Sequence, residues 1–175
     1  MDGNTARAWF SGLVAGAKAL PVIAVLLFSL SRLQGVPSDG LLFLAQSESE
    51  TLRSGEPVAI RLMLLSRGHA VVWVPTLLLE GANLSLEVLD PSGERVSYLG
   101  PKSTLKPLDR GHVIRLRPEY FYGKRVVLSD YFAMKKTGTY RVRVEFRNED
   151  SGKGRELDVW TGRLASNEIR IEIRE

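Results

Sequence analysis

The amino-acid sequence predicts an all-β protein: an antiparallel β-sandwich of about seven to nine strands, preceded by an N-terminal hydrophobic signal or anchor helix. After residue 40, most segments alternate apolar and polar side chains with a period of two, and Gly, Pro, Asp and Ser separate them. No segment in that part of the chain has the periodicity of a long amphipathic helix. We therefore predict a signal peptide or signal-anchor over 1–35 and a sandwich domain over 36–175.

The N-terminal apolar run ALPVIAVLLFSL (19–30) has the layout of a secretory signal, with Arg7 and Lys18 before it and small or polar residues after it. Its length is below the roughly 20 residues of an ordinary transmembrane helix. Residues 8–30, in which Lys18 is the only charge, are long enough for a signal-anchor. The layout predicts an exported protein that is periplasmic, extracellular or membrane-anchored. It leaves cleavage or anchoring open, and membrane contact is expected only through 8–30 in an uncleaved chain.

The body of the chain then divides into short period-2 segments. Tight turns separate several of them, and DPSG (90–93), with Pro second and Gly fourth, predicts a hairpin. In the last segment Ile169, Ile171 and Ile173 alternate with charged residues, which is typical of a half-buried strand. The predicted strands are 41–48, 58–65, 70–74, 84–90, 94–99, 112–117, 124–129, 139–146, 155–160 and 167–174.

The segment GTYRVRVEF (138–146) raises the question of whether its two arginines form a site. Tyr140 follows a Gly at the start of a strand near the end of the domain, which favours a tyrosine corner with a buried ring and a hydroxyl bonded to the backbone. Arg141 and Arg143 then lie on the opposite, solvated face. We interpret the segment as a structural strand.

Composition and charge narrow the classes of function. The chain has 175 residues, 44% hydrophobic and 25% charged, and contains no cysteine. Disulfides, thiolate metal sites and a lipoprotein anchor are therefore excluded. The net charge of +4 is too small to predict a nucleic-acid binder. Residues 102–136 hold nine basic and three acidic residues, which indicates either a solvated basic face or a contact surface for an anionic partner.

Catalytic and metal-binding patterns are missing from the sequence. The two histidines, His69 and His112, lack the spacing of a zinc site. The segment NEDSGKGRELD (148–158) has clustered carboxylates, but Lys153 and Arg155 interrupt it, which favours a hairpin over a calcium loop. No G-x-S-x-G, phosphate-binding or dinucleotide motif occurs. We expect a protein without enzymatic activity, cofactor or metal.

The segment PEYFYGKR (118–125) is the strongest candidate for binding. Its three consecutive aromatic side chains cannot all face inward from one strand, so at least one is expected at the surface, beside basic residues. The alternative is a loop that closes one end of the sandwich. The candidate binding residues are Tyr120, Phe121, Tyr122, Lys124, Arg125, Trp73 and Trp160.

Three longer phrases point to a known fold family: LEVLDPSGERVSYLGP (86–101), VVLSDYFAMKKTGTYRVRVEF (126–146) and WTGRLASNEIRIEI (160–173). Together they resemble the immunoglobulin-like β-sandwich of exported bacterial proteins, including the non-catalytic domain that precedes the catalytic domain of deuterolysin-like metallopeptidases. The phrases that match are structural, and the HExxH helix of those peptidases is absent. The resemblance implies an accessory or stand-alone immunoglobulin-like domain.

These observations lead to one functional hypothesis and two alternatives. We expect an exported, non-enzymatic binding module of the bacterial envelope that recognises another protein or an envelope component. A peptidase inhibitor is the first alternative, with the apolar segment VPTLLLEGAN (74–83) as its inhibitory loop. A carbohydrate-binding module is the second, through Trp73, Trp160 or the aromatic run. The oligomeric state is left open.

Overall fold

The computed structural model describes residues 40–76, 83–101, 108–153 and 157–175. The signal segment predicted over 1–35, and the boundary after it, lie outside these residues. The described residues form an all-β fold, and their only helices are three-residue 3-10 turns. The elements are β1 (Leu41–Ser47), β2 (Thr51–Arg53), β3 (Ala59–Ser66), β4 (Val72–Pro75), β5 (Leu84–Leu89), η2 (Arg110–His112), β6 (Val113–Leu116), β7 (Phe121–Val127), η3 (Leu128–Asp130), β8 (Gly138–Asn148), β9 (Gly162–Ala165) and β10 (Ile169–Arg174). Within this part of the chain, no helix has the length and apolar character needed to cross a membrane.

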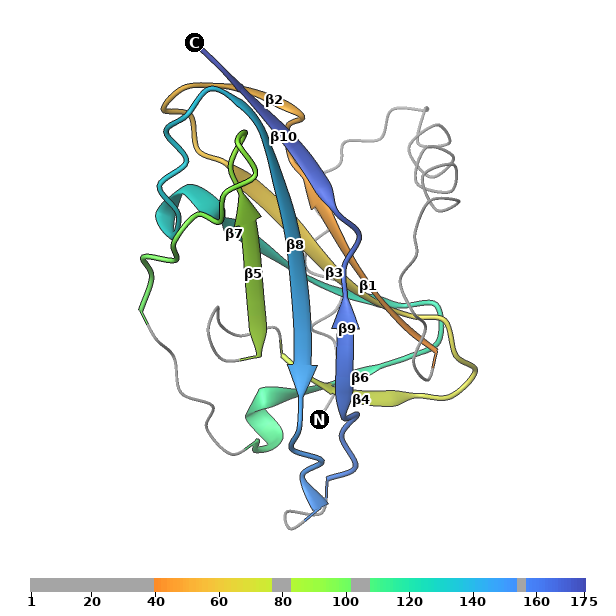
Figure 1. The fold of residues 1–175 in the computed structure, drawn as a ribbon. Coiled ribbons are helices and arrows are strands. Elements are labelled where there is room, and N and C mark those ends of the chain that lie inside the picture. The colour runs from red at the N-terminus through yellow and green to blue at the C-terminus, as the bar shows by residue number, and fades with distance from the viewer. Residues whose placement is uncertain (1–39, 77–82, 102–107, 154–156) are drawn as a thin grey trace, which may run out of the picture. The chain divides into compact units, whose positions relative to one another are not determined.

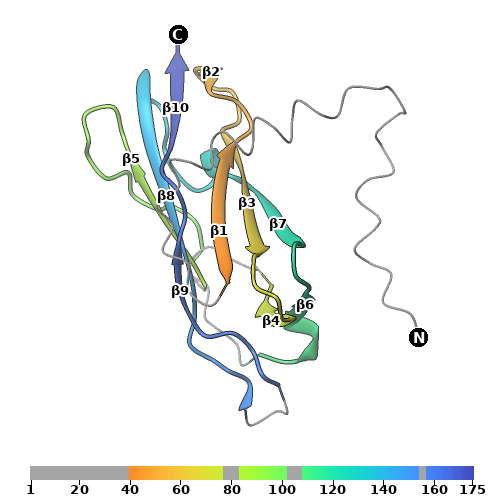
Figure 2. The same ribbon diagram turned by 90° about the vertical axis from the view of Figure 1, so that its right-hand side faces the viewer.

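Two larger sheets and one small sheet make up the fold (Figure 1). The first larger sheet has the order β1-β3-β7, and the second has the order β2-β10-β8-β5 with β9 also paired to β8. Strands β4 and β6 form the small sheet. Every strand pair is antiparallel except β2 with β10. Viewed from the side, the two larger sheets are separate layers that face each other (Figure 2).

The core lies between these two layers, because alternate side chains of each strand point inward. Strand β8 shows the alternation most clearly: Tyr140, Val142, Val144 and Phe146 are buried, and the arginines between them are exposed. Phe146 packs across the core against the first sheet, since its ring centroid lies 5.8 Å from that of Phe43. Burial of such rings is the main stabilising contribution that the sequence pattern encodes.

Tyr140 has the geometry predicted for a tyrosine corner. The side chain is 1% exposed, and its hydroxyl accepts a hydrogen bond of 2.9 Å from the backbone N–H of Lys136. Arg141 and Arg143 are exposed on the other face of β8, and Arg143 lies 3.3 Å from Glu168. The two arginines therefore form part of a solvated row, as the alternation predicted.

Two predicted strands are wrong. Residues 94–99 begin as the second arm of the hairpin, with a bridge between Leu89 and Arg95, but the arm then leaves β5 and Tyr98 bridges to Phe132 instead. Residues 155–160 contribute only the bridge from Val159 to Trp73, with 154–156 outside the described residues. Their apolar residues pack as single anchors rather than as continuous strands.

Two short strands were not predicted, and a third strand begins earlier than predicted. Strand β2 is only three residues long, and β9 lies in the phrase WTGRLAS, whose Gly and Ser resemble a loop. Strand β7 begins at Phe121 rather than at Lys124, so most of the predicted aromatic loop is part of the first sheet.

Candidate functional site

Strand alternation divides the aromatic run between two faces of the first sheet. Phe121 is 56% exposed, and so is Tyr120, which precedes the strand. Tyr122 is half-buried and packs against the core, so it contributes less to the surface than Tyr120 and Phe121 do. Glu119, in the turn before Tyr120, has a φ of 65°, a conformation that is uncommon for residues other than glycine. The turn thus places Tyr120 and Phe121 next to each other at the surface.

The neighbours of Phe121 on the same sheet face are apolar at one end and charged at the other. Phe121 is opposite Leu65 of β3, and Met63 follows in the next outward position; both are half-buried. We call Tyr120, Phe121, Met63 and Leu65 the aromatic patch. The next outward pair along the strands is Arg61 with Arg125. Aromatic residues, Met and Arg are the residue types enriched in protein–protein interfaces.

Glu48 joins the two arginines beside the aromatic patch. Its carboxylate lies 3.0 Å from Nε of Arg61 and 3.0 Å from Nε of Arg125. The hydrogen bond from Arg61 is the main cause that lowers the pKa of the Glu48 carboxyl, and Arg125 adds to it, while burial opposes both. Arg125 therefore lies where the sequence placed a binding residue, but part of its charge is already neutralised. Lys124 lies on the opposite side of the strand and is half-buried.

The two tryptophans proposed as binding residues have different environments. Trp73 is 39% exposed on β4, opposite Arg115. Trp160 is 7% exposed and stacks on Phe146 with 5.7 Å between ring centroids and an interplanar angle of 15°. The indole of Trp160 is therefore a core group, which corrects the proposal that it contributes to a binding surface. Among the described residues, no ring contact joins Trp73 to the aromatic run.

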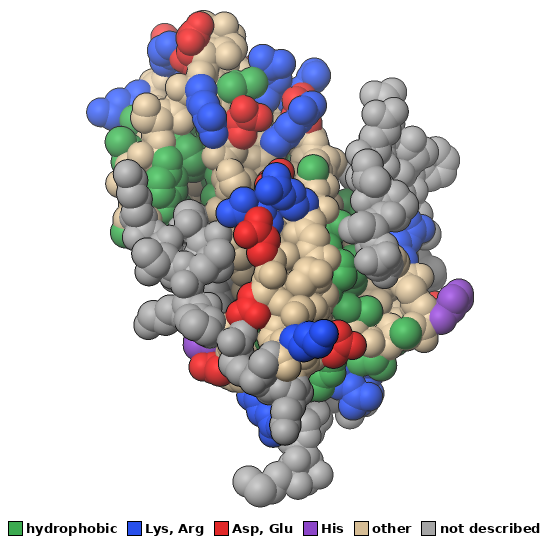
Figure 3. Space-filling view, turned by 60° about the horizontal axis from the view of Figure 1, so that its bottom comes forward, with side chains coloured by type: hydrophobic (Ala, Val, Ile, Leu, Met, Phe, Trp, Pro, Cys, Tyr) green, Lys and Arg blue, Asp and Glu red, His purple; other side chains and the backbone are tan. Residues whose placement is uncertain are grey.

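The basic excess of 102–136 is partly neutralised in the structure. Lys102 and Lys106 lie outside the described residues. Lys136 forms an ion pair and hydrogen bond with Asp90, which is buried in the turn of the β5 hairpin. Acidic and basic side chains are mixed along the face that Figure 3 presents, with hydrophobic side chains on its flanks. Lys136 and Arg125 are each paired with a carboxylate, so these two residues do not contribute to a continuous positively charged surface.

The candidate metal-binding and inhibitory segments are only partly described. In the resolved ranges, no group of three or more His, Asp or Glu is arranged to hold a metal ion. Asp150, from the predicted hairpin 148–158, accepts hydrogen bonds from the backbone N–H groups of Gly152 and Leu108. His112 Nδ1 lies 2.9 Å from an Asp109 carboxylate oxygen. Most of the proposed inhibitory loop, residues 77–82, lies outside the described residues.

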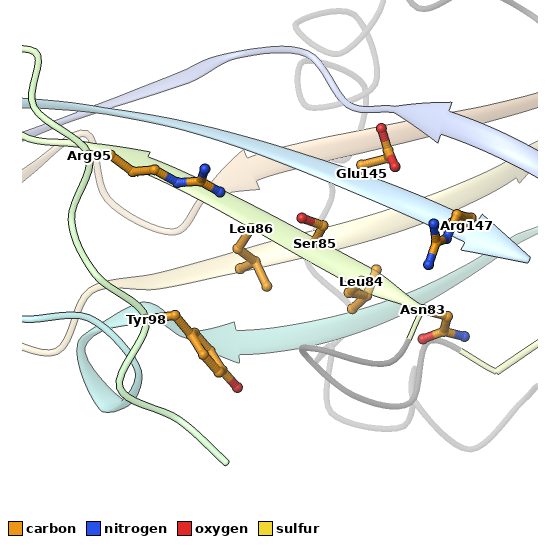
Figure 4. Close-up of a pocket in the computed structure, with 8 residues that line it drawn as sticks. All are labelled: Asn83, Leu84, Ser85, Leu86, Arg95, Tyr98, Glu145 and Arg147. Atoms are coloured by element: carbon orange, nitrogen blue, oxygen red, sulfur yellow. The ribbon is translucent and has the colours of Figure 1, made fainter. Parts of the chain in front are cut away.

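A second candidate site, which the sequence did not indicate, is a groove along the outer edge of β5 (Figure 4). It has a cavity volume of about 400 Å³. Figure 4 shows Arg95 and Tyr98 toward one end of the strand and Asn83 and Arg147 toward the other. We call this site the edge groove; it is lined by Asn83, Leu84, Ser85, Leu86, Arg95, Tyr98, Glu145 and Arg147.

Comparison with known proteins adds no assignment, because no family model and no curated protein matches the chain. The resemblance to the immunoglobulin-like domains of exported bacterial proteins therefore stays a prediction.

Proposed function

We propose that the chain is an exported, non-enzymatic binding module of the bacterial envelope, that its body is an immunoglobulin-like sandwich, and that the aromatic patch recognises another protein. Immunoglobulin domains place strands A, B, E and D in one sheet and C, F and G in the other. Taking β1, β3 and β7 as A, B and E, and β5, β8 and β9–β10 as C, F and G, gives agreement in chain order and sheet order. The body of the chain has no described strand in position D.

Two local features support the same assignment. Tyr140 lies near the start of β8 and bonds back to the backbone, as the corner tyrosine of strand F does. Val142 is two residues later, where antibody domains carry their second cysteine, and here it is fully buried. An apolar core at this position agrees with a chain that contains no cysteine.

The exposure of Tyr120 and Phe121 is the observation that carries the proposed function. Two adjacent aromatic side chains, each 56% exposed, leave apolar surface in water, which is unfavourable unless a partner covers it. The half-buried Met63 and Leu65 extend this surface. Aromatic anchors of this kind contribute most of the binding energy at many protein interfaces. The burial of Trp160 disfavours the carbohydrate-binding alternative, since Trp73 is the only exposed indole among the described residues.

The test replaces only the two exposed rings. We expect Tyr120→Ser with Phe121→Ser to abolish cross-linking to envelope proteins that the unmodified chain captures, without changing the urea midpoint. Tyr122 is left intact because it packs against the core. Leu99→Ser is the matched control, since Leu99 is 67% exposed and lies outside the patch. An unchanged set of cross-linked partners in the double variant would show that the patch is not the recognition surface.

A further inference from the structure

We infer that the edge groove binds an extended peptide segment of another protein, which pairs with the free edge of β5 as an added strand. The inference rests on the proposed function as a binding module, but it concerns a surface separate from the aromatic patch.

Hydrogen bonding along β5 shows which backbone groups are free. The hairpin arm pairs with the edge only at its far end, where the N–H of Val96 donates to the carbonyl of Val88 over 2.8 Å. In a strand, the N–H and C=O groups of one residue point to the same edge, and successive residues alternate between the two edges. The backbone groups of Leu84 and Leu86 therefore point to the same edge as those of Val88. No described residue forms a hydrogen bond with them on that side. Unpaired edge groups of this kind are a template for strand addition.

Asn83 adds a buried acceptor to the same groove. The residue is 5% exposed, and its Nδ2 donates to the carbonyl of Thr76 over 3.1 Å. Its Oδ1 is buried and has no hydrogen-bond partner among the described residues. Buried side-chain oxygens nearly always accept a hydrogen bond, so this atom favours a ligand that brings an N–H group.

The two sides of the groove differ in chemistry. Leu84, Leu86 and the half-buried ring of Tyr98 make the inner side apolar. Arg95 is exposed and forms no ion pair with a described residue, so its end of the groove favours an acidic side chain. Glu145 and Arg147 both line the groove toward its other end, and their opposite charges favour a neutral polar side chain there. The expected segment alternates apolar residues with one acidic and one neutral polar residue.

The dimensions of the site favour a short segment over a second copy of this chain. With respect to the described residues, only Leu84 and Leu86 of β5 present backbone groups without a partner on this edge, because the hairpin arm occupies the position beside Val88. A second β5 strand is six residues long and is followed by its own hairpin arm. A cavity of about 400 Å³ is suited to a few residues of an extended chain.

The probe is the capped peptide acetyl-Val-Asp-Val-Ser-Val-amide, in both sequence orders, titrated into the ¹⁵N-labelled full-length protein. We expect saturable shifts of the amide signals of Leu84 and Leu86. A peptide N-methylated at the valine amides should not bind, because strand addition requires those N–H groups. No shift at millimolar peptide, or equal binding of the N-methylated peptide, would overturn the inference.

Charge variants test the orientation of the peptide. Arg95→Glu should weaken binding about tenfold through the loss of a charge-assisted hydrogen bond, and a peptide with Lys in place of Asp should recover it. Arg53→Glu is the matched control, since Arg53 is an exposed arginine on β2, at the opposite edge of the second sheet. The aromatic-patch double variant should still bind the peptide. Loss of partners in that variant together with a failed peptide titration would refute this inference and leave the proposed function intact.

Discussion

Tyr140→Phe tests the tyrosine corner by removing one atom. The ring is 1% exposed and remains buried in the variant, so almost no apolar burial is lost. The loss is the acceptor of the 2.9 Å hydrogen bond from the Lys136 N–H. Leaving a buried donor unpaired costs about 1–3 kcal/mol, and because the Lys136 side chain is exposed and water is near, we expect about 1–2 kcal/mol.

Urea unfolding, monitored by tryptophan fluorescence, measures this change in the free energy of unfolding, since Trp160 is buried and stacked on Phe146. A loss of about 1–2 kcal/mol lowers the melting temperature by roughly 3–8 °C in a domain of this size. Tyr120→Phe is the matched control because that residue is 56% exposed, and it should change stability by less than about 0.5 kcal/mol. Equal stability of the two variants would refute the corner as a stabilising contact.

Two further predictions concern the hairpin turn and the start of β8. The hydrogen bond from Lys136 holds the pKa of the Asp90 carboxyl well below its usual range, so the folded protein binds fewer protons than the unfolded chain and stability should fall as the pH drops below about 4. Asp90→Asn should flatten this acid dependence in urea midpoints measured from pH 7 to pH 3, and an unchanged slope would contradict the assignment. Gly138 has a φ of 121°, and an added Cβ would lie 2.8 Å from Cβ of Pro91. Gly138→Ala should therefore destabilise the protein more than Gly55→Ala, because Gly55 has a φ of 89° but nothing lies within 4 Å of a Cβ added there. Both substitutions should cost at least about 1 kcal/mol of stability in thermal unfolding. Equal costs would exclude the steric contribution at Gly138.

The strands that could be predicted are those whose alternation reflects burial directly. In β8 and β10 every second residue is buried, so the pattern of apolar residues and the pattern of contacts coincide. Residues 94–99 carry a similar alternation for a different reason. Val96 and Tyr98 pack against the core as separate anchors, and the ring of Tyr98 lies 5.5 Å from that of Phe132. Sequence periodicity does not distinguish these two cases.

The candidate sites differ in how much of each could be predicted from the sequence. The aromatic patch was predictable in part, because consecutive aromatic residues on a strand must divide between its faces, and Phe121 lies outward while Tyr122 lies inward. Trp160 was misplaced because the sequence does not reveal that its ring stacks on Phe146. The edge groove was not predictable, since it depends on where the hairpin arm leaves β5, and DPSG specifies the turn but not the length of the paired arms.

Lys136 connects features that the sequence presents as separate motifs. Its backbone N–H bonds to the hydroxyl of Tyr140, and its side chain pairs with Asp90 in the hairpin turn. Asp90 in turn accepts hydrogen bonds from the backbone N–H groups of Ser92 and Glu94, which fixes the start of the hairpin arm. The arm that borders the edge groove is therefore tied through one lysine to the corner that begins β8. We expect this link to hold the arm in place beside the groove, which would lower the entropic cost of binding the proposed peptide.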